Sequence, residues 1–301
     1  MPTDMKHIFK IAENSVAISV SEGVTAWKEI EPRYQPFAVE SDAKQALEIN
    51  VRAGAIPESG GERIYEPDYG GIGFITACAS RLADGALVME FSHVEQKQPS
   101  LWMKMPPRLD RAEIVIVPDC GDDTYFLTHA LMIAFMLGTC RTGTLLIHAS
   151  SVLYDGKAYL FQGKSGTGKS THAALWTAHI AGAELLNDDN PVIRFTPDGV
   201  AMAYGSPWSG KTHCYRNVSA PIGALVRIVR AKNNELRKLE PLRAYASLTT
   251  SVFFMPFLSE EMLAERHRVI ERMATEVPCC EMYCRPEAEA ALTCRDSLYK
   301  S

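Results

Sequence analysis

The sequence predicts an α/β protein, α+β overall, with a β-rich first region and an α/β core after it. Short apolar segments follow one another closely before residue 118, a long apolar segment covers residues 126–140, and a strand, a glycine-rich loop and a helix follow at 158–180. Closely spaced strands favour an antiparallel sheet, whereas a strand, loop and helix in succession favour an α/β unit. We therefore expect one domain over residues 1–120 and another over 121–301.

The first region is expected to be an antiparallel β region. Glycine, proline and aspartate separate its apolar segments at short intervals, as turns do between neighbouring strands. The predicted strands cover residues 17–20, 37–39, 47–51, 72–77, 86–91 and 113–117. We find no catalytic constellation among these residues, so the chemistry is expected in the second region.

The apolar segment at 126–140 is expected to form a buried helix that joins the two regions. Its apolar residues go most of the way round a helix, which is typical of a helix buried on several sides. It stops at Arg141, short of the roughly 20 residues that a membrane-spanning helix needs. The sequence therefore predicts no membrane association.

Composition indicates which partners do not suit this chain and in which compartment it is expected to work. The chain has 301 residues, with 31 Lys and Arg against 36 Asp and Glu, so its formal net charge of -5 does not favour nucleic acid. Eight cysteines are dispersed along the chain and no secretory signal precedes them, which favours free thiols in the cytoplasm. The cluster Cys279, Cys280, Cys284 and Cys294 lacks the paired spacing of a zinc site.

The second region is expected to contain two strand hairpins, further strands and helices, with the second hairpin at 191–204 turning at Pro197, Asp198 and Gly199. Asp155-Gly156 suits a two-residue turn between two strands, and glycines follow the second of these strands directly. Predicted strands cover 145–153, 158–161, 191–195, 200–204, 224–229 and 277–282, and predicted helices cover 170–180, 259–274 and 286–298.

The residues from Gly163 to Ser170 match the phosphate-loop pattern of glycine, any four residues, glycine, lysine, and serine or threonine. Small residues let successive backbone N–H groups surround phosphate oxygens, and the helix that follows adds its positive end. We expect ATP as the ligand, with magnesium on the Ser170 hydroxyl. The candidate nucleotide-binding residues are Gly163, Ser165, Gly166, Thr167, Gly168, Lys169, Ser170 and Thr171.

Two adjacent acids, Asp188 and Asp189, follow about 20 residues after Lys169, at the end of a short apolar segment. In a site that also holds magnesium, one carboxylate can contact the metal while the other accepts a proton from an attacking hydroxyl. The alternative is that Asp188, Asp189, Asn190 and Pro191 form a turn that introduces a hairpin.

These residues together resemble the C-terminal kinase domain of HPr kinase/phosphorylase and its relatives, which share a nucleotide-binding core with ATP-dependent phosphoenolpyruvate carboxykinase. The resemblance covers about half of the chain, from Leu145 to the last helix. It rests on an ordered set: Leu146 to Ser150, Gly163 to Thr171, Leu186 to Asp189, and Gly205 to Lys211. It implies a phosphate-loop core of the HPr-kinase/carboxykinase type after the β-rich region.

The resemblance also implies roles for single residues. Lys169 would contact the phosphates, Ser170 would ligate magnesium, Asp188 would act as the base towards the acceptor hydroxyl, and Asp189 would support the metal. The order of the two aspartates could be exchanged. His148 matches a histidine beside the phosphate site that could orient or relay a proton. The alternative for His148 is a hydrogen-bonded core residue.

One further position differs from HPr kinases, and several others have more than one possible role. Thr171 stands where HPr kinases commonly have an acid, so HPr itself is in doubt as the substrate. Lys211 is either a cationic contact to substrate or γ-phosphate, or an exposed residue of a tight turn. Three arginines could neutralise the transferring phosphoryl group, and the sequence does not rank them: Arg216, Arg227 and Arg230.

The function expected from these observations is an ATP- and magnesium-dependent kinase that phosphorylates a hydroxyl, of the serine type, on a small molecule, peptide or protein. A nucleotide-gated regulator with little turnover and a carboxykinase-like enzyme are the alternatives. The acceptor and the oligomeric state, a homo-oligomer included, stay open.

Overall fold

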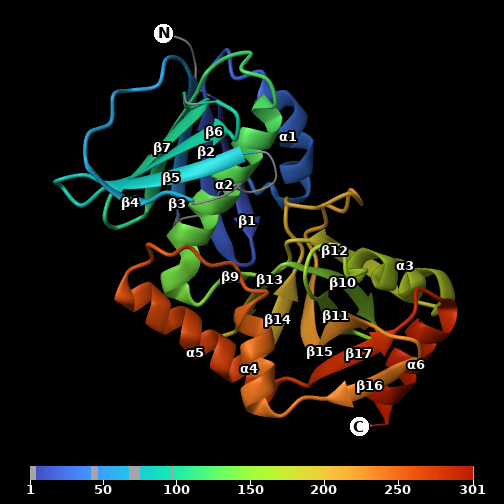
Figure 1. The fold of residues 1–301 in the computed structure, drawn as a ribbon. Coiled ribbons are helices and arrows are strands. Elements are labelled where there is room, and N and C mark those ends of the chain that lie inside the picture. The colour runs from blue at the N-terminus through green and yellow to red at the C-terminus, as the bar shows by residue number, and fades with distance from the viewer. Residues whose placement is uncertain (1–4, 42–46, 68–74, 97, 301) are drawn as a thin grey trace. The chain divides into compact units, whose positions relative to one another are not determined.

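The computed structural model describes residues 5–41, 47–67, 75–96 and 98–300 (Figure 1). The chain divides into two compact units, Met1–Thr139 with Met255–Ser259, and Cys140–Phe254 with Glu260–Ser301. This division differs from the expected boundary at residue 120, because the helix after that residue packs on strands of the first unit.

The described part of the first unit contains an eight-stranded mixed sheet in the order β1-β2-β3-β8-β7-β6-β5-β4. Helix α1 (Ala26–Tyr34) connects β2 to β3, which lie parallel, and β3 is also parallel to β8. The expectation of a purely antiparallel region is therefore wrong for these pairs. A crossover that contains α1 allows β2 and β3 to lie parallel, and the chain passes through β4 to β7 before β8 joins β3. The strands are β1 (Met5–Ile11), β2 (Asn14–Val20), β3 (Leu47–Ala53), β4 (Glu62–Tyr65), β5 (Ile75–Arg81), β6 (Leu87–His93), β7 (Leu101–Met105) and β8 (Arg111–Ile116).

Some predicted and observed elements of this unit differ. The strand expected at 37–39 is reduced to an isolated antiparallel bridge between Ala38 and Phe9, because Phe37 ends the short 3-10 helix η1 (Gln35–Phe37), which has a proline in its first turn. Residues 72–74 of another predicted strand lie outside the described residues. The sequence analysis missed β1, β4, β7 and α1, and α1 has Pro32 inside it, a residue that normally breaks a helix.

The buried helix expected at 126–140 is confirmed as α2 (Asp123–Thr139). Phe126, Leu131 and Phe135 are each at most 1% exposed, which fits a helix covered on several sides. Within the part of the chain that the structure describes, no helix has the length and apolar character to span a membrane.

The second unit has a nine-stranded mixed sheet in its described residues. Neighbouring strands run β12-β10-β11-β15-β14-β13-β9, and β17 lies between β15 and β16. The strands are β9 (Leu145–Leu146), β10 (Ala149–Tyr154), β11 (Lys157–Gln162), β12 (Glu184–Asp189), β13 (Val192–Phe195), β14 (Ala201–Tyr204), β15 (Ser219–Arg230), β16 (Glu235–Lys238) and β17 (Cys279–Cys284).

The predicted hairpin between β10 and β11 is confirmed. Tyr154 pairs with Lys157 around Asp155 (φ 49°) and Gly156 (φ 70°), and two positive φ angles are what a twisted two-residue turn requires. The strand expected over 145–153 is interrupted, because residues 147 and 148 bond to another segment: Ile147 pairs with Val252.

The short 3-10 helix η2 (Cys140–Thr142) and four α-helices complete the described second unit. The α-helices are α3 (Lys169–His179), α4 (Pro241–Thr249), α5 (Glu260–Glu276) and α6 (Ala288–Tyr299). Helices α3 and α6 lie against one face of the sheet, where Phe161, Trp176, Met282 and Cys294 belong to one buried cluster (Figure 1). The sequence predicted α3, α5 and α6 and missed α4 and β16. The second unit therefore places the phosphate-loop motif between the central strand β11 and helix α3.

Candidate active site

The loop between β11 and α3 has the backbone shape of an anion-binding loop. Gly163 (φ 146°), Gly166 (φ 77°) and Gly168 (φ 108°) adopt positive φ angles that other residues rarely tolerate. Within the loop, the Thr167 hydroxyl donates to the Lys164 carbonyl at 2.8 Å. Helix α3 begins at Lys169, so the first N–H groups of the helix lack intrahelical acceptors and favour an anion at this point.

Lys169 folds back under the loop. Its Nζ donates to the carbonyl oxygen of Gly163 at 3.1 Å and lies 2.9 Å from Nε2 of His148. The residue is 8% exposed, and burial lowers the pKa of its ammonium group, against the opposing charges of Asp189 and Asp188. The lysine of the motif is therefore held at the place where phosphate would bind.

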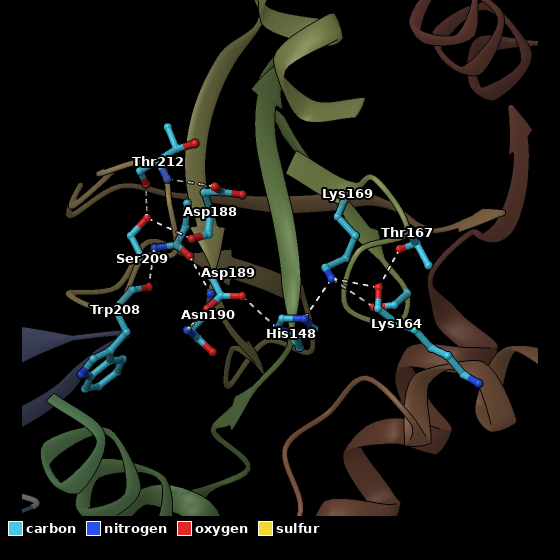
Figure 2. A network of polar contacts seen from close by, with 12 residues as sticks. His148, Lys164, Thr167, Lys169, Asp188, Asp189, Asn190, Trp208, Ser209 and Thr212 are labelled. Atoms are coloured by element: carbon cyan, nitrogen blue, oxygen red, sulfur yellow. Dashed lines mark hydrogen bonds and ion pairs between the residues drawn. The ribbon is translucent and has the colours of Figure 1, made fainter. Parts of the chain in front are cut away.

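A chain of three side chains joins the loop to the acidic pair, as Figure 2 shows. His148 Nε2 contacts Lys169, and His148 Nδ1 lies 2.9 Å from Oδ1 of Asp189. With Lys169 protonated, Nε2 has to accept, so the ring proton lies on Nδ1 and is donated to Asp189. His148 thus has two polar partners, which also satisfies the alternative of a hydrogen-bonded structural histidine.

Asp189 closes β12 in an uncommon backbone conformation. Its φ is 124°, and its second carboxylate oxygen accepts a hydrogen bond from Asn190 Nδ2 at 3.0 Å. Its neighbour Ser209 pairs with it in an isolated β-bridge. These contacts hold the Asp189 carboxylate beside His148.

Asp188 is more deeply buried than Asp189, with 2% of its surface exposed. The backbone N–H of Thr212 donates to its Oδ2 at 3.4 Å, and its Oδ1 is buried with no hydrogen-bond partner among the described residues. Ser209 Oγ donates to the Asp188 carbonyl at 2.9 Å (Figure 2). A buried carboxylate oxygen without a protein partner is costly unless water or a ligand supplies a hydrogen bond, so this oxygen is available to such a group.

Asn187 is a residue of this site that the sequence analysis did not single out. It is fully buried, and its Nδ2 lies within 3.4 Å of the carbonyl oxygens of Ser206, Trp208 and Cys214. Its Oδ1 accepts from the Asn190 backbone N–H at 3.0 Å. Asn187 therefore fastens the segment 206–214 to the end of β12. The sequence carries no signal for this role, because it rests on carbonyl groups 19 to 27 positions away.

The three candidate arginines differ in whether they contact the loop. Arg230 reaches the loop, where its guanidinium donates to the carbonyl oxygens of Gly166 and Thr167. The other two bond elsewhere: Arg216 to Leu185 and Glu184, and Arg227 to Ser247 and Thr250. The Lys211 side chain is exposed on the segment fastened by Asn187.

Two further histidines of the second unit, His172 and His213, make other contacts. His172 is buried in α3 and accepts from Trp176 Nε1 at 3.2 Å, and burial lowers its pKa to about 4. His213 stacks on Tyr215. In the described ranges, no group of three or more His, Cys, Asp or Glu side chains is arranged to hold a metal ion. Every cysteine of the chain is a free thiol.

Distant likenesses to this chain are found among solved structures. No family model matches the chain, and no curated protein matches it. The solved structure of the HPr(Ser) kinase/phosphatase from Coxiella burnetii is similar over 52% of this chain and 97% of that chain, with a TM-score of 0.31 and 11% sequence identity. A likeness at this level carries no functional argument, so function has to be argued from the contacts of the site.

Proposed function

We propose that the chain is an ATP- and magnesium-dependent kinase that transfers the γ-phosphoryl group to a hydroxyl of the serine type on a small molecule, peptide or protein. The observation that carries the proposal is the chain of contacts Lys169, His148 and Asp189, which brings the phosphate loop and the acidic pair to one edge of the sheet. Phosphate binding and proton acceptance are the two tasks of such a reaction.

The proposed binding step uses the loop. Its backbone N–H groups and the start of α3 would hold the phosphate oxygens, and Lys169 would exchange its contact with the Gly163 carbonyl for a phosphate oxygen. Arg230 adds a second positive charge beside the same loop. The loop would thus neutralise charge on the donor without covalent chemistry.

Magnesium fits the donor groups at this edge. Ser170 presents an exposed hydroxyl on the first turn of α3, and the Asp189 carboxylate is partly exposed at the end of β12. Hydroxyl and carboxylate oxygens suit this ion, which takes its other ligands from phosphates and water in nucleotide sites. Ser170 and Asp189 would hold it, and when bound it supplies positive charge against the phosphates.

Asp188 is the proposed base. As the acceptor oxygen forms its bond to the γ-phosphorus and the bond to the ADP oxygen breaks, the hydroxyl proton passes to the Asp188 carboxylate. The Thr212 N–H and the segment fastened by Asn187 hold that carboxylate in place. A nucleotide-gated regulator needs the loop but no proton acceptor, so the buried, partly unpartnered Asp188 favours the kinase.

Nucleotide titration and a transfer assay test the proposal. Calorimetry with magnesium and ATP should detect binding to the wild type and weaker binding to Lys169→Ala, with Lys28→Ala as the control because that lysine is exposed on α1 of the first unit. Labelled ATP with a cell extract should then mark a component only in the presence of active protein. Equal ATP binding by wild type and Lys169→Ala, or no labelled acceptor, would contradict the kinase.

A further inference from the structure

A cavity of about 470 Å³ lies directly beside the phosphate loop, within the second unit. Thr167 and Gly168 of the loop form one side of it, and α3 contributes Thr171 and Leu175. The ends of β15 and β17 provide the other side. Its volume is in the range of small-molecule sites. None of the contacts of Lys169, His148 and the two aspartates involves this cavity.

The strand order fixes where the cavity lies relative to the acids. Strands β11, β15 and β17 are parallel neighbours, so their carboxyl ends meet at one edge, where ligands of open α/β sheets bind. The loop follows β11. Asp189 and His148 lie on the β10 and β12 side of the loop, and the cavity lies on the β15 and β17 side. The loop therefore separates the cavity from the acidic pair.

This separation indicates which substrate of a kinase, the phosphoryl donor or the acceptor, would bind in the cavity. An acceptor hydroxyl has to reach Asp188, and a molecule in the cavity has the whole loop between it and that carboxylate. A nucleoside triphosphate bound by the loop with its γ-phosphate towards Asp189 would direct its other end away from the acids, over β15 and β17. The cavity lies where that end would arrive.

The side chains around the cavity suit a base and a sugar. Leu175, Ile228 and Pro286 offer apolar surface, and Arg285 lies at the rim with its guanidinium 3.4 Å from Glu287. Apolar side chains and guanidinium planes both pack on the flat face of a base. Arg230 lines the cavity and also contacts the loop, so it links the two parts.

We infer that this cavity binds the nucleoside part of the phosphoryl donor, so that the donor lies across the sheet edge from β17 to β12. The inference rests on the proposed function, because it takes the loop to hold the donor phosphates. It assigns Leu175 and Arg285 to donor recognition, a role separate from that of the motif residues.

Titrations with two ligands test the nucleoside site separately from the proposed kinase function. Inorganic tripolyphosphate has the phosphates without a nucleoside, so it should bind the loop alone, whereas ATP should use the loop and the cavity. Titrations of each with magnesium should be made on wild type, Leu175→Trp, which fills the cavity, and Arg285→Ala, which removes an exposed side chain from its rim. Arg243→Ala, exposed on α4, is the matched control.

Leu175→Trp and Arg285→Ala should each weaken ATP by roughly five- to a hundredfold, the range of one base-stacking contact, and leave tripolyphosphate unchanged. Circular dichroism checks that each variant folds. If Leu175→Trp misfolds, the ATP affinity of Arg285→Ala alone tests the nucleoside site. Unchanged ATP affinity, or equal losses for both ligands, would overturn the nucleoside site while leaving the loop intact. Failure of wild type to bind either ligand would overturn the proposed function and the inference with it.

Discussion

Asp188 on β12 pairs with Ser150 on β10, and each of these neighbours has a buried side-chain oxygen without a hydrogen-bond partner among the described residues. Two such oxygens on adjacent strands are an expensive arrangement for the fold alone. The cost is understandable if the Asp188 oxygen meets a reacting hydroxyl, and this leads to the first prediction.

Asp188→Asn should reduce phosphoryl transfer by about a hundred- to ten-thousandfold and change ATP affinity little, because the amide keeps the volume but cannot take the proton. Asp189→Asn should weaken ATP binding in magnesium. Transfer rates and nucleotide titrations on both variants measure this, with the exposed Asp198→Asn as control. If the two variants exchange their effects, the roles of the aspartates are exchanged. If transfer is unchanged in both, the acids are only a turn.

His148→Phe should lower the transfer rate by about ten- to a hundredfold, the usual cost of losing a group that orients a functional side chain. The phenyl ring removes the partner of Lys169 Nζ and of Asp189 Oδ1 at once. The ATP affinity should fall less than in Lys169→Ala, because the lysine charge is kept. The comparison variant is His213→Phe, which alters an exposed ring. A rate equal to wild type would assign His148 to the core.

Asn187→Ala should lower the free energy of unfolding by about 2 kcal/mol, because buried carbonyl groups of the segment 206–214 lose their donor. The transfer rate should fall as well, since the same segment carries the Thr212 N–H that contacts Asp188. Urea unfolding and transfer assays measure the two effects. Asn217→Ala, at an exposed position, should leave both near wild type.

The stability of the protein should fall as the pH drops below about 6.5 because of His172. Burial lowers its folded pKa from 6.5 to about 4, so between these values the unfolded chain binds a proton that the folded chain does not. At pH 5 this costs about 2 kcal/mol relative to neutral pH. Urea unfolding at pH 7.5 and pH 5 should show a smaller loss in His172→Gln than in wild type. An identical loss in both would assign the pH dependence to other groups.

The parts of the site that the sequence predicted are contiguous in the chain. The phosphate loop and the acidic pair are short motifs whose residue types follow from their chemistry, and the strand, loop and helix around Gly163 to Ser170 form as expected. His148 was found only through the resemblance, because a single histidine in an apolar segment has no distinctive pattern.

The parts that the sequence analysis missed, or named without ranking as it did Arg230, depend on contacts between distant residues. Arg230 lies 63 positions from Thr167, and only the parallel pairing of β11 with β15 brings them together. Asn187 is recognisable only once the segment 206–214 has folded onto it. In the first unit, the parallel pair β2-β3 depends on the crossover that contains α1, a helix that Pro32 made hard to predict. The parallel pair β3-β8 joins strands that β4 to β7 separate in the chain.

At Asp189, the residue type that suits the backbone conformation differs from the one that the proposed site needs. A non-glycine residue at φ 124° costs about 1–3 kcal/mol, and glycine would adopt the same conformation with less strain. Glycine, however, would remove the carboxylate that His148 contacts. Selection of random variants for heat resistance alone would therefore favour glycine at this position and yield more stable proteins that lack the carboxylate of the proposed magnesium site.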